Sequence, residues 1–210
     1  MEYVKDYKKE YKDLYVPKTV PVIVDIPEMM FVAVEGRGNP NDQSGAYQKA
    51  VELLYNIQYT IKMSKKGNYI PDGYFDYVVP PLESFWWLGN SGDWSSKSEY
   101  NWLAAIRLPE FITDEVFEWA RSEASKKKKI DVENAQYLTI KEGLCVQCMH
   151  AGSYDEEPKT LKLMDDFIAA NRLEKDINET RRHHEIYLSN PNKTEISKLK
   201  TVLRIPVKNI

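Results

Sequence analysis

An ordered set of segments occurs twice along the chain, and this repetition restricts the folds open to it. Each half reads as a strand, a glycine turn, a helix, a strand with a glutamate and a strand that ends near a proline. Gly38 corresponds to Gly152 in this comparison, and Glu83 corresponds to Glu185. Self-similarity in a fixed order indicates a repeated structural unit, although unrelated strand–helix–strand segments also resemble one another. The pattern predicts a duplicated β-α-β-β unit.

Two such units predict an α+β fold in which two antiparallel sheets lie side by side. We expect the helices on one face and a concave ligand cavity on the opposite face. The two glutamates would meet at the seam, where pockets are common. The predicted organisation is an N-terminal amphipathic arm over residues 1–19 and a domain over residues 20–208, divided into a first half (about 20–110), a linking helix (about 113–129) and a second half (about 136–208).

Hydrophobic periodicity and turn residues place the individual elements. In the first half we expect strands at residues 22–26, 29–35, 74–82 and 100–108, with a helix at residues 44–65. In the second half we expect strands at residues 137–140, 143–150, 181–188 and 201–207, with a helix at residues 158–171.

The strand at residues 181–188 carries the most unusual face of the chain. The two-residue period of a strand places His183, Glu185 and Tyr187 together, and it directs His184 and Ile186 into an ordinary core. A carboxylate flanked by aromatic side chains is costly to bury unless it is paired, protonated or used in chemistry. Glu185 is therefore the first candidate for a functional residue.

Composition and charge exclude several classes of protein. The chain is 42% hydrophobic with a net charge of −3, and its basic residues are spread out except at residues 126–129. Proteins that bind nucleic acid directly usually carry a cluster of Lys and Arg on one face, and this distribution does not predict such a cluster. Apolar runs stay shorter than the roughly 18 residues of a membrane span, and the N-terminus does not resemble a signal peptide. We expect a cytoplasmic protein without membrane contact; the oligomeric state stays open.

The cysteines and histidines do not form a recognisable metal motif. Cys145 and Cys148 are three positions apart in a predicted strand, so their thiols point to opposite faces and cannot share one ion. Adjacent His183 and His184 also face opposite ways, so at most His183 joins Glu185, together with His150 if a neighbouring strand brings it there. We expect reduced, packed cysteines, no metal site and no cofactor.

Aromatic side chains gather near the two glutamates in the sequence. Large rings hold planar ligands by offset stacking, so we expect a ligand cavity, although plain core packing explains the same residues. The candidates for ligand contact are Trp86, Trp87, Trp102, Met149, Tyr154 and His183.

Several motifs resemble the GyrI-like small-molecule-binding family, namely the segment 185–188 after a histidine pair, the Asn190-Pro191 turn, the closing segment 203–207 and the glycine turn at 151–154. The resemblance spans roughly residues 20–208. It implies a duplicated β-α-β-β fold with a glutamate, here Glu185, at the bottom of an aromatic cavity. We expect a stand-alone domain without a DNA-binding helix-turn-helix. The Trp-Trp pair after Glu83 is similar to a subset, the cyclopropanoid cyclopropyl hydrolases, that opens the cyclopropane of DNA-alkylating natural products.

Two main functions follow. In the first, the protein is a cofactor-independent hydrolase that detoxifies a hydrophobic aromatic small molecule. Glu185, its pKa raised by desolvation, is then the general base toward water, and Tyr187 or a protonated Glu83 donates to a developing oxyanion. In the second, the protein is a non-catalytic module that sequesters or senses multiple drugs, and Glu185 supplies the countercharge to a cationic ligand. A third and weaker alternative is a gyrase-interacting protein.

Overall fold

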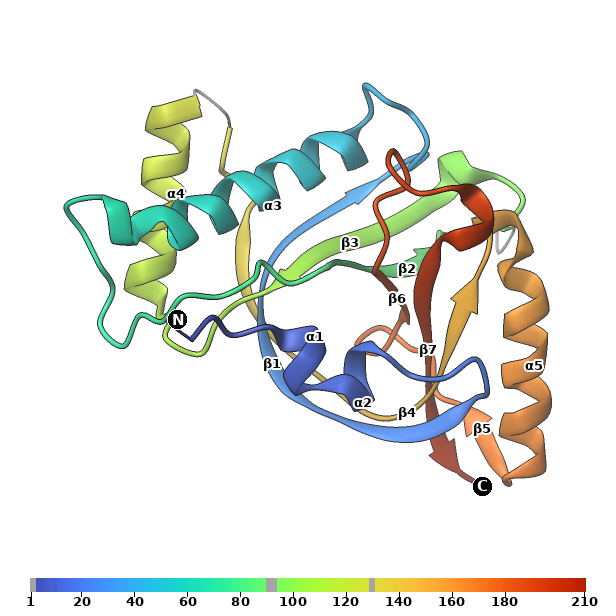
Figure 1. Ribbon diagram of the computed structural model, residues 1–210. Coiled ribbons are helices and arrows are strands. Elements are labelled where there is room, and N and C mark those ends of the chain that lie inside the picture. The colour runs from blue at the N-terminus through green and yellow to red at the C-terminus, as the bar shows by residue number, and fades with distance from the viewer. Residues whose placement is uncertain (1–2, 90–93, 129–130) are drawn as a thin grey trace. The chain divides into compact units, whose positions relative to one another are not determined.

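The computed structural model describes residues 3–89, 94–128 and 131–210. Helices and strands are mixed along the chain (Figure 1), as the α+β prediction requires. The helices are α1 (Tyr7–Glu10), α2 (Lys12–Tyr15), α3 (Ala46–Lys62), α4 (Asp114–Lys128) and α5 (Glu157–Ala170), with short 3-10 turns η1 (Met63–Lys66), η2 (Lys97–Glu99), η3 (Tyr154–Glu156) and η4 (Ile196–Lys198). The strands are β1 (Val22–Arg37), β2 (Leu82–Leu88), β3 (Tyr100–Arg107), β4 (Gln136–Ala151), β5 (Leu173–Lys175), β6 (His183–Tyr187) and β7 (Lys200–Asn209).

The chain divides into two units that are each discontinuous in sequence. The first unit contains Met1–Tyr7, Met29–Pro80 and Trp87–Ile140, and the second contains Lys8–Glu28, Pro81–Trp86 and Lys141–Ile210. The predicted halves were continuous segments, and that division stays a prediction, as does the duplication. Residues 1 and 2 of the predicted arm and residue 129 of the predicted linking helix lie outside the described residues.

The first unit combines an antiparallel strand pair with two helices. Strand β1 pairs with β3 in a register that runs from Phe31 opposite Arg107 to Arg37 opposite Asn101. Helix α3 contacts both β3 and α4 (Figure 1). Its apolar stripe follows the helical period, and the buried members are Tyr47, Ala50, Leu53, Leu54, Ile57 and Ile61.

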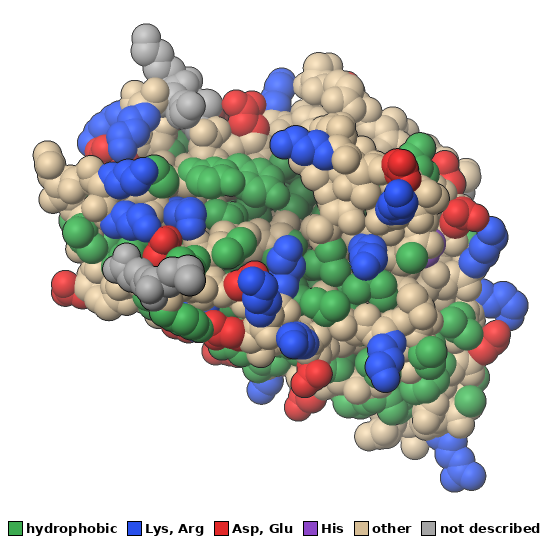
Figure 2. Space-filling model, in the orientation of Figure 1, with side chains coloured by type: hydrophobic (Ala, Val, Ile, Leu, Met, Phe, Trp, Pro, Cys, Tyr) green, Lys and Arg blue, Asp and Glu red, His purple; other side chains and the backbone are tan. Residues whose placement is uncertain are grey.

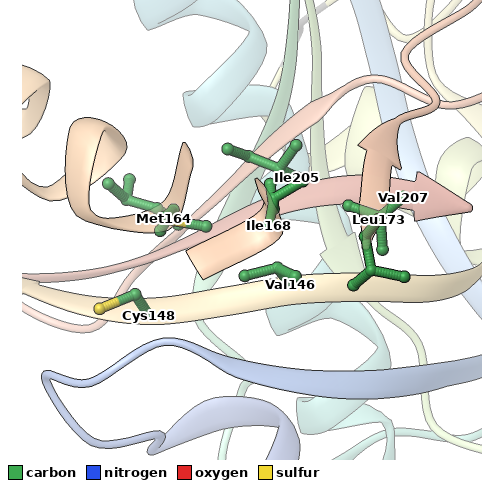
Figure 3. Packing of buried hydrophobic residues seen from close by; sticks show 8 residues of the cluster. Val146, Cys148, Met164, Ile168, Leu173, Ile205 and Val207 are labelled. Atoms are coloured by element: carbon green, nitrogen blue, oxygen red, sulfur yellow. The ribbon is translucent and has the colours of Figure 1, made fainter. Parts of the chain in front are cut away.

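The second unit contains an antiparallel ladder in the local order β2, β6, β7, β4, and β5 pairs with the end of β7. Helix α5 covers one face of this ladder. Its Met164 and Ile168 pack against side chains of β4, β5 and β7 to form a hydrophobic core (Figure 3). Each fully buried aliphatic side chain of this kind contributes about 1.5–3 kcal/mol relative to exposure. The core consists of Val146, Cys148, Met164, Ile168, Leu173, Leu203, Ile205 and Val207.

The N-terminal arm is anchored by buried aromatic and aliphatic side chains. It forms two short helices, α1 and α2. In the second unit, Leu14 is 8% exposed and Tyr15 is fully buried. In the first unit, the Tyr7 hydroxyl donates to Glu110 at 2.6 Å.

Some predicted strand boundaries were wrong. The strand expected at residues 74–82 is largely irregular, with only an isolated bridge between Tyr77 and Lys5, and β2 begins at Leu82 instead. Pro80 and Pro81 explain the shift, because proline cannot donate to a strand ladder. In contrast, each pair of short strands predicted at 22–35 and at 137–150 is one continuous strand.

Surface charges on the face shown in Figure 2 are interspersed, with blue basic side chains among red acidic and green hydrophobic ones. Within the described ranges, none of the helices has the length and apolar character needed to cross a lipid bilayer.

Candidate functional site

Strand β6 places three of the predicted site residues on one face. Its burial alternates: His184 and Ile186 are buried, whereas His183, Glu185 and Tyr187 are only partly buried. Glu185 accepts a hydrogen bond from the Tyr187 hydroxyl at 2.7 Å, and its other oxygen lies 3.1 Å from His183 Nε2. The side chains of His183 and Glu185 remain 13% and 14% exposed. The predicted grouping of these residues is confirmed.

Two aromatic residues complete this arrangement. Trp86, opposite His183 in the register of β2 and β6, donates its indole N–H to the Tyr187 oxygen at 3.1 Å. The ring of Tyr154 meets the Tyr187 ring edge-on, with centroids 6.0 Å apart. Burial, together with the charges of nearby glutamates including Glu185, raises the pKa of Tyr154. We call these five residues, Trp86, Tyr154, His183, Glu185 and Tyr187, the Glu185 cluster.

The Glu185 cluster projects from the face of the ladder that α5 covers. Glu185 lies opposite Leu203, which in turn lies opposite Cys148, and both of these residues belong to the α5 core. Directly paired residues of antiparallel strands share a face. The prediction that this glutamate faces away from the helices was therefore wrong within the second unit.

The second predicted glutamate lies on the other face. The sequence comparison matched Glu83 with Glu185, but in the register of β2 and β6 Glu83 lies opposite Ile186. The two glutamates are therefore one residue out of register. A one-residue offset directs a side chain to the opposite face. Glu83 is fully buried and accepts a hydrogen bond from Tyr15 at 3.2 Å. The structure does not bring it into the Glu185 cluster.

Three candidates for ligand contact are not members of the Glu185 cluster. Met149 is opposite Val202, which pairs with Ile186, so Met149 shares the face of Glu83. Trp87 and Trp102 belong to the first unit. Trp87 is half-buried, whereas Trp102 is 1% exposed. The ligand roles of these three residues stay predictions.

Trp102 lines a hollow in the first unit. Its ring meets Tyr47 edge-on with centroids 5.2 Å apart. The hollow has a volume of about 360 Å³ and is lined by both apolar and charged side chains. Its lining residues are Val34, Glu35, Gly36, Ala46, Lys49, Ala50, Glu52, Leu53, Trp102, Asp131 and Asn134.

Sequence reasoning missed a buried charge network on the face opposite the Glu185 cluster. His184 Nδ1 lies 2.9 Å from a Glu142 oxygen, and Arg204 Nη1 donates to the same carboxylate at 3.1 Å. His184 Nε2 is 3.0 Å from Glu83, but the alignment falls outside hydrogen-bond geometry. The Phe85 ring stacks on the imidazole at 4.0 Å. We call Glu83, Glu142, Gln147, His184 and Arg204 the buried network.

The buried network also holds the N-terminal arm. Arg204 Nε donates to Gln147 Oε1 at 2.9 Å, Arg204 Nη2 donates to the Leu14 carbonyl, and Gln147 donates to the Asp13 carbonyl. The sequence signal was an arginine and a histidine inside otherwise apolar strands, because charges are rarely buried without partners.

Electrostatics within the buried network favour the charged forms. Burial alone would raise the pKa of Glu142, but the nearby charges of His184 and Arg204 and their hydrogen bonds lower it to about 2. Burial opposes the charged form of His184, whereas Glu142 and Glu83 raise its pKa above the ordinary value. Opposite charges thus offset the cost of burial.

The two cysteines are free and buried, as predicted. Burial, with the charge of Glu142, raises the pKa of Cys145 to about 12, and burial raises the pKa of Cys148 to about 11. Among the described residues, no group of three or more His, Cys, Asp and Glu side chains is placed to hold a metal ion.

One protein family matches nearly the whole chain. The family described as the GyrI-like small molecule binding domain matches residues 19–208. The chain belongs to this GyrI-like family. The predicted family resemblance is therefore confirmed over nearly the whole chain.

Several solved structures are similar to this GyrI-like protein. An uncharacterized conserved protein from Listeria innocua is 46% identical, with a TM-score of 0.93, over 97% of this chain and 100% of that one. A hydrolase from Listeria innocua is 45% identical, with a TM-score of 0.89, over the same shares. The C-terminal domain of EcmrR, at 12% identity and a TM-score of 0.52 over 90% of this chain and 98% of that one, shares the fold. No curated protein matches the chain.

Proposed function

We propose that this GyrI-like domain binds a bulky, planar, hydrophobic small molecule and opens a strained electrophilic ring in it by hydrolysis. The substrate class is the cyclopropane-bearing, DNA-alkylating natural products, and the physiological role is detoxification. The observation that carries this proposal is a partly accessible carboxylate, Glu185, held by a phenol and an imidazole beside aromatic rings. The Listeria innocua relative named as a hydrolase, 45% identical, supports it.

The chemistry requires water, a proton acceptor and a binding surface. The Glu185 cluster supplies a negative charge and a basic nitrogen next to one another, so that an attacking water can be oriented and deprotonated. Trp86 and Tyr154 provide ring faces and edges for stacking against a planar ligand. The Tyr187 hydrogen is already donated to Glu185, so we assign Tyr187 to the orientation of that carboxylate.

The test is to incubate the protein with a carbonyl-activated cyclopropane and to follow addition of one water by mass spectrometry. We expect Glu185→Gln to reduce the rate by about 10²–10⁴-fold, the range typical of lost acid–base catalysis, because the cluster then lacks the carboxylate on which proton transfer depends. Glu174, half-exposed and paired with Lys208, provides the control variant Glu174→Gln, which keeps the wild-type rate. If Glu185→Gln turns over as fast as the wild type, the assignment of this cluster is wrong.

One observation favours the alternative of a binding module without catalysis. Both oxygens of Glu185 already accept hydrogen bonds, an arrangement that also suits a fixed countercharge for a cationic aromatic ligand. Tight binding of a lipophilic cation, measured by calorimetry, with the ligand recovered unchanged after prolonged incubation would favour this function over hydrolysis.

A further inference from the structure

We infer that His183, rather than Glu185 itself, is the group that accepts the proton of water, with Glu185 as its positioning partner. This inference rests on the proposed hydrolysis and assigns the proton transfer to one atom, His183 Nδ1. The two residues lie two positions apart on β6, and His183 Nε2 is 3.1 Å from Glu185 Oε1. The site is thus a carboxylate–imidazole pair.

The hydrogen bond to Glu185 determines the tautomer of His183. A carboxylate only accepts hydrogen bonds, so the neutral imidazole must carry its hydrogen on Nε2 to donate to Glu185. The lone pair then resides on Nδ1. Among the residues that the structure describes, none forms a hydrogen bond with His183 Nδ1, and the side chain is 13% exposed. Among the described residues, His183 Nδ1 therefore has no hydrogen-bond partner that would compete with a water molecule.

The surroundings of Glu185 fit a positioning role. Tyr187 donates to one of its oxygens at 2.7 Å while the other faces His183, and the Trp86 indole in turn donates to Tyr187 at 3.1 Å. This chain of donors fixes the carboxylate in one orientation. A fixed carboxylate beside an imidazole holds the ring and stabilises the imidazolium that forms when the ring accepts a proton.

The step balances with water as the only co-reactant. His183 Nδ1 takes a proton from water as the water oxygen forms a bond to a ring carbon of the cyclopropane. The carbon–carbon bond to that atom breaks, and its electron pair moves into the conjugated carbonyl group. The resulting enolate oxygen takes up a proton, and the imidazolium releases its own to solvent. The product contains one added water.

Two substitutions separate the proton acceptor from a merely orienting residue. His183→Gln retains an N–H donor toward Glu185 but lacks a basic nitrogen, and we expect it to lower kcat by about 10²-fold or more. His183→Ala should lose activity to a similar extent and recover at least about tenfold when imidazole is added, as expected for a missing base. Wild type and Glu185→Gln, given the same imidazole, serve as controls and should show no increase.

A second measurement does not depend on activity. In protein labelled with ¹⁵N-histidine, NMR should show the neutral His183 ring protonated on Nε2, with the signal identified by its loss in His183→Gln. In Glu185→Gln this tautomer preference should weaken. A neutral ring protonated on Nδ1 in the wild type would overturn the inference whatever the activity.

The outcomes distinguish this inference from the function on which it rests. If the wild type opens the ring and His183→Gln does so at the same rate, His183 is not the proton acceptor, and the hydrolysis stands. If the wild type leaves every activated cyclopropane unchanged, the hydrolysis fails and the catalytic role of His183 fails with it. Loss in His183→Gln, with imidazole rescue of His183→Ala, supports both.

Discussion

Replacing Glu142 by glutamine should strongly destabilise the second unit. The carboxylate is 5% exposed and contacts both His184 and Arg204, so the substitution leaves the buried Arg204 cation and the His184 imidazole facing a neutral amide. The difference between the ordinary glutamate pKa of 4.5 and the value of about 2 corresponds to about 3 kcal/mol. Breaking a buried ion pair typically costs about 3–5 kcal/mol, which is a large part of the stability of a domain.

The pH dependence of this loss has a definite sign. A carboxylate whose folded pKa is lowered stabilises the protein above its unfolded pKa, and this stabilisation disappears as the pH falls toward the folded value. For Glu142 the window runs from its ordinary value of 4.5 down to about 2. At pH 3 its contribution should therefore be only roughly half of that at pH 7.

The assay is unfolding by urea, followed by tryptophan fluorescence, of the wild type and Glu142→Gln at pH 7 and pH 3. The matched control is Glu174→Gln, whose surface pair with Lys208 should contribute less than about 1 kcal/mol at either pH. Equal midpoints for wild type and Glu142→Gln at pH 7, or a difference that persists undiminished at pH 3, would refute the reasoning.

Two further predictions concern packing. An alanine at Gly36 would place its Cβ 2.3 Å from the Trp102 ring, so Gly36→Ala should destabilise the protein by about 1–3 kcal/mol and lower its Tm in calorimetry. The control Gly67→Ala, whose Cβ would come no closer than 3.4 Å to a neighbour, should change Tm much less, and equal effects would contradict this account. Because burial raises the pKa of both cysteine thiols, Cys145 and Cys148 should react with a disulfide reagent at pH 8 only after unfolding; rapid reaction of the native protein would count against it.

The local periodicities of the sequence predicted much of the fold. The apolar stripe of α3 and the alternation along β6 depend only on 3.6- and two-residue repeats, which side chains near in sequence specify. The two glycines matched in the repeat, Gly38 and Gly152, both adopt positive φ values of 123° and 131°, which glycine accommodates without a Cβ clash. Their shared conformation is consistent with the predicted duplication.

The ends of the strands, and the sheet face to which each side chain points, were harder to predict. Tyr74 to Leu82 has a strand-like composition, but the prolines at its end exclude a continuous ladder. Glu83 appeared equivalent to Glu185, yet its register directs it to the opposite face. A shift of one residue, which hardly alters a sequence pattern, reverses the direction of a side chain.

The sequence by itself determined that β6 presents His183, Glu185 and Tyr187 together, because a strand alternates its side chains whatever its neighbours are. Only the tertiary structure decided which partners these residues meet, and it revealed that His184 belongs to a network with Glu142 and Arg204. Those partners are 42 and 20 positions away along the chain, and pairing across strands fixes their contacts. The physical reason is that a charge is stable in a protein interior only beside its counter-charges, and their positions depend on the register of the whole ladder.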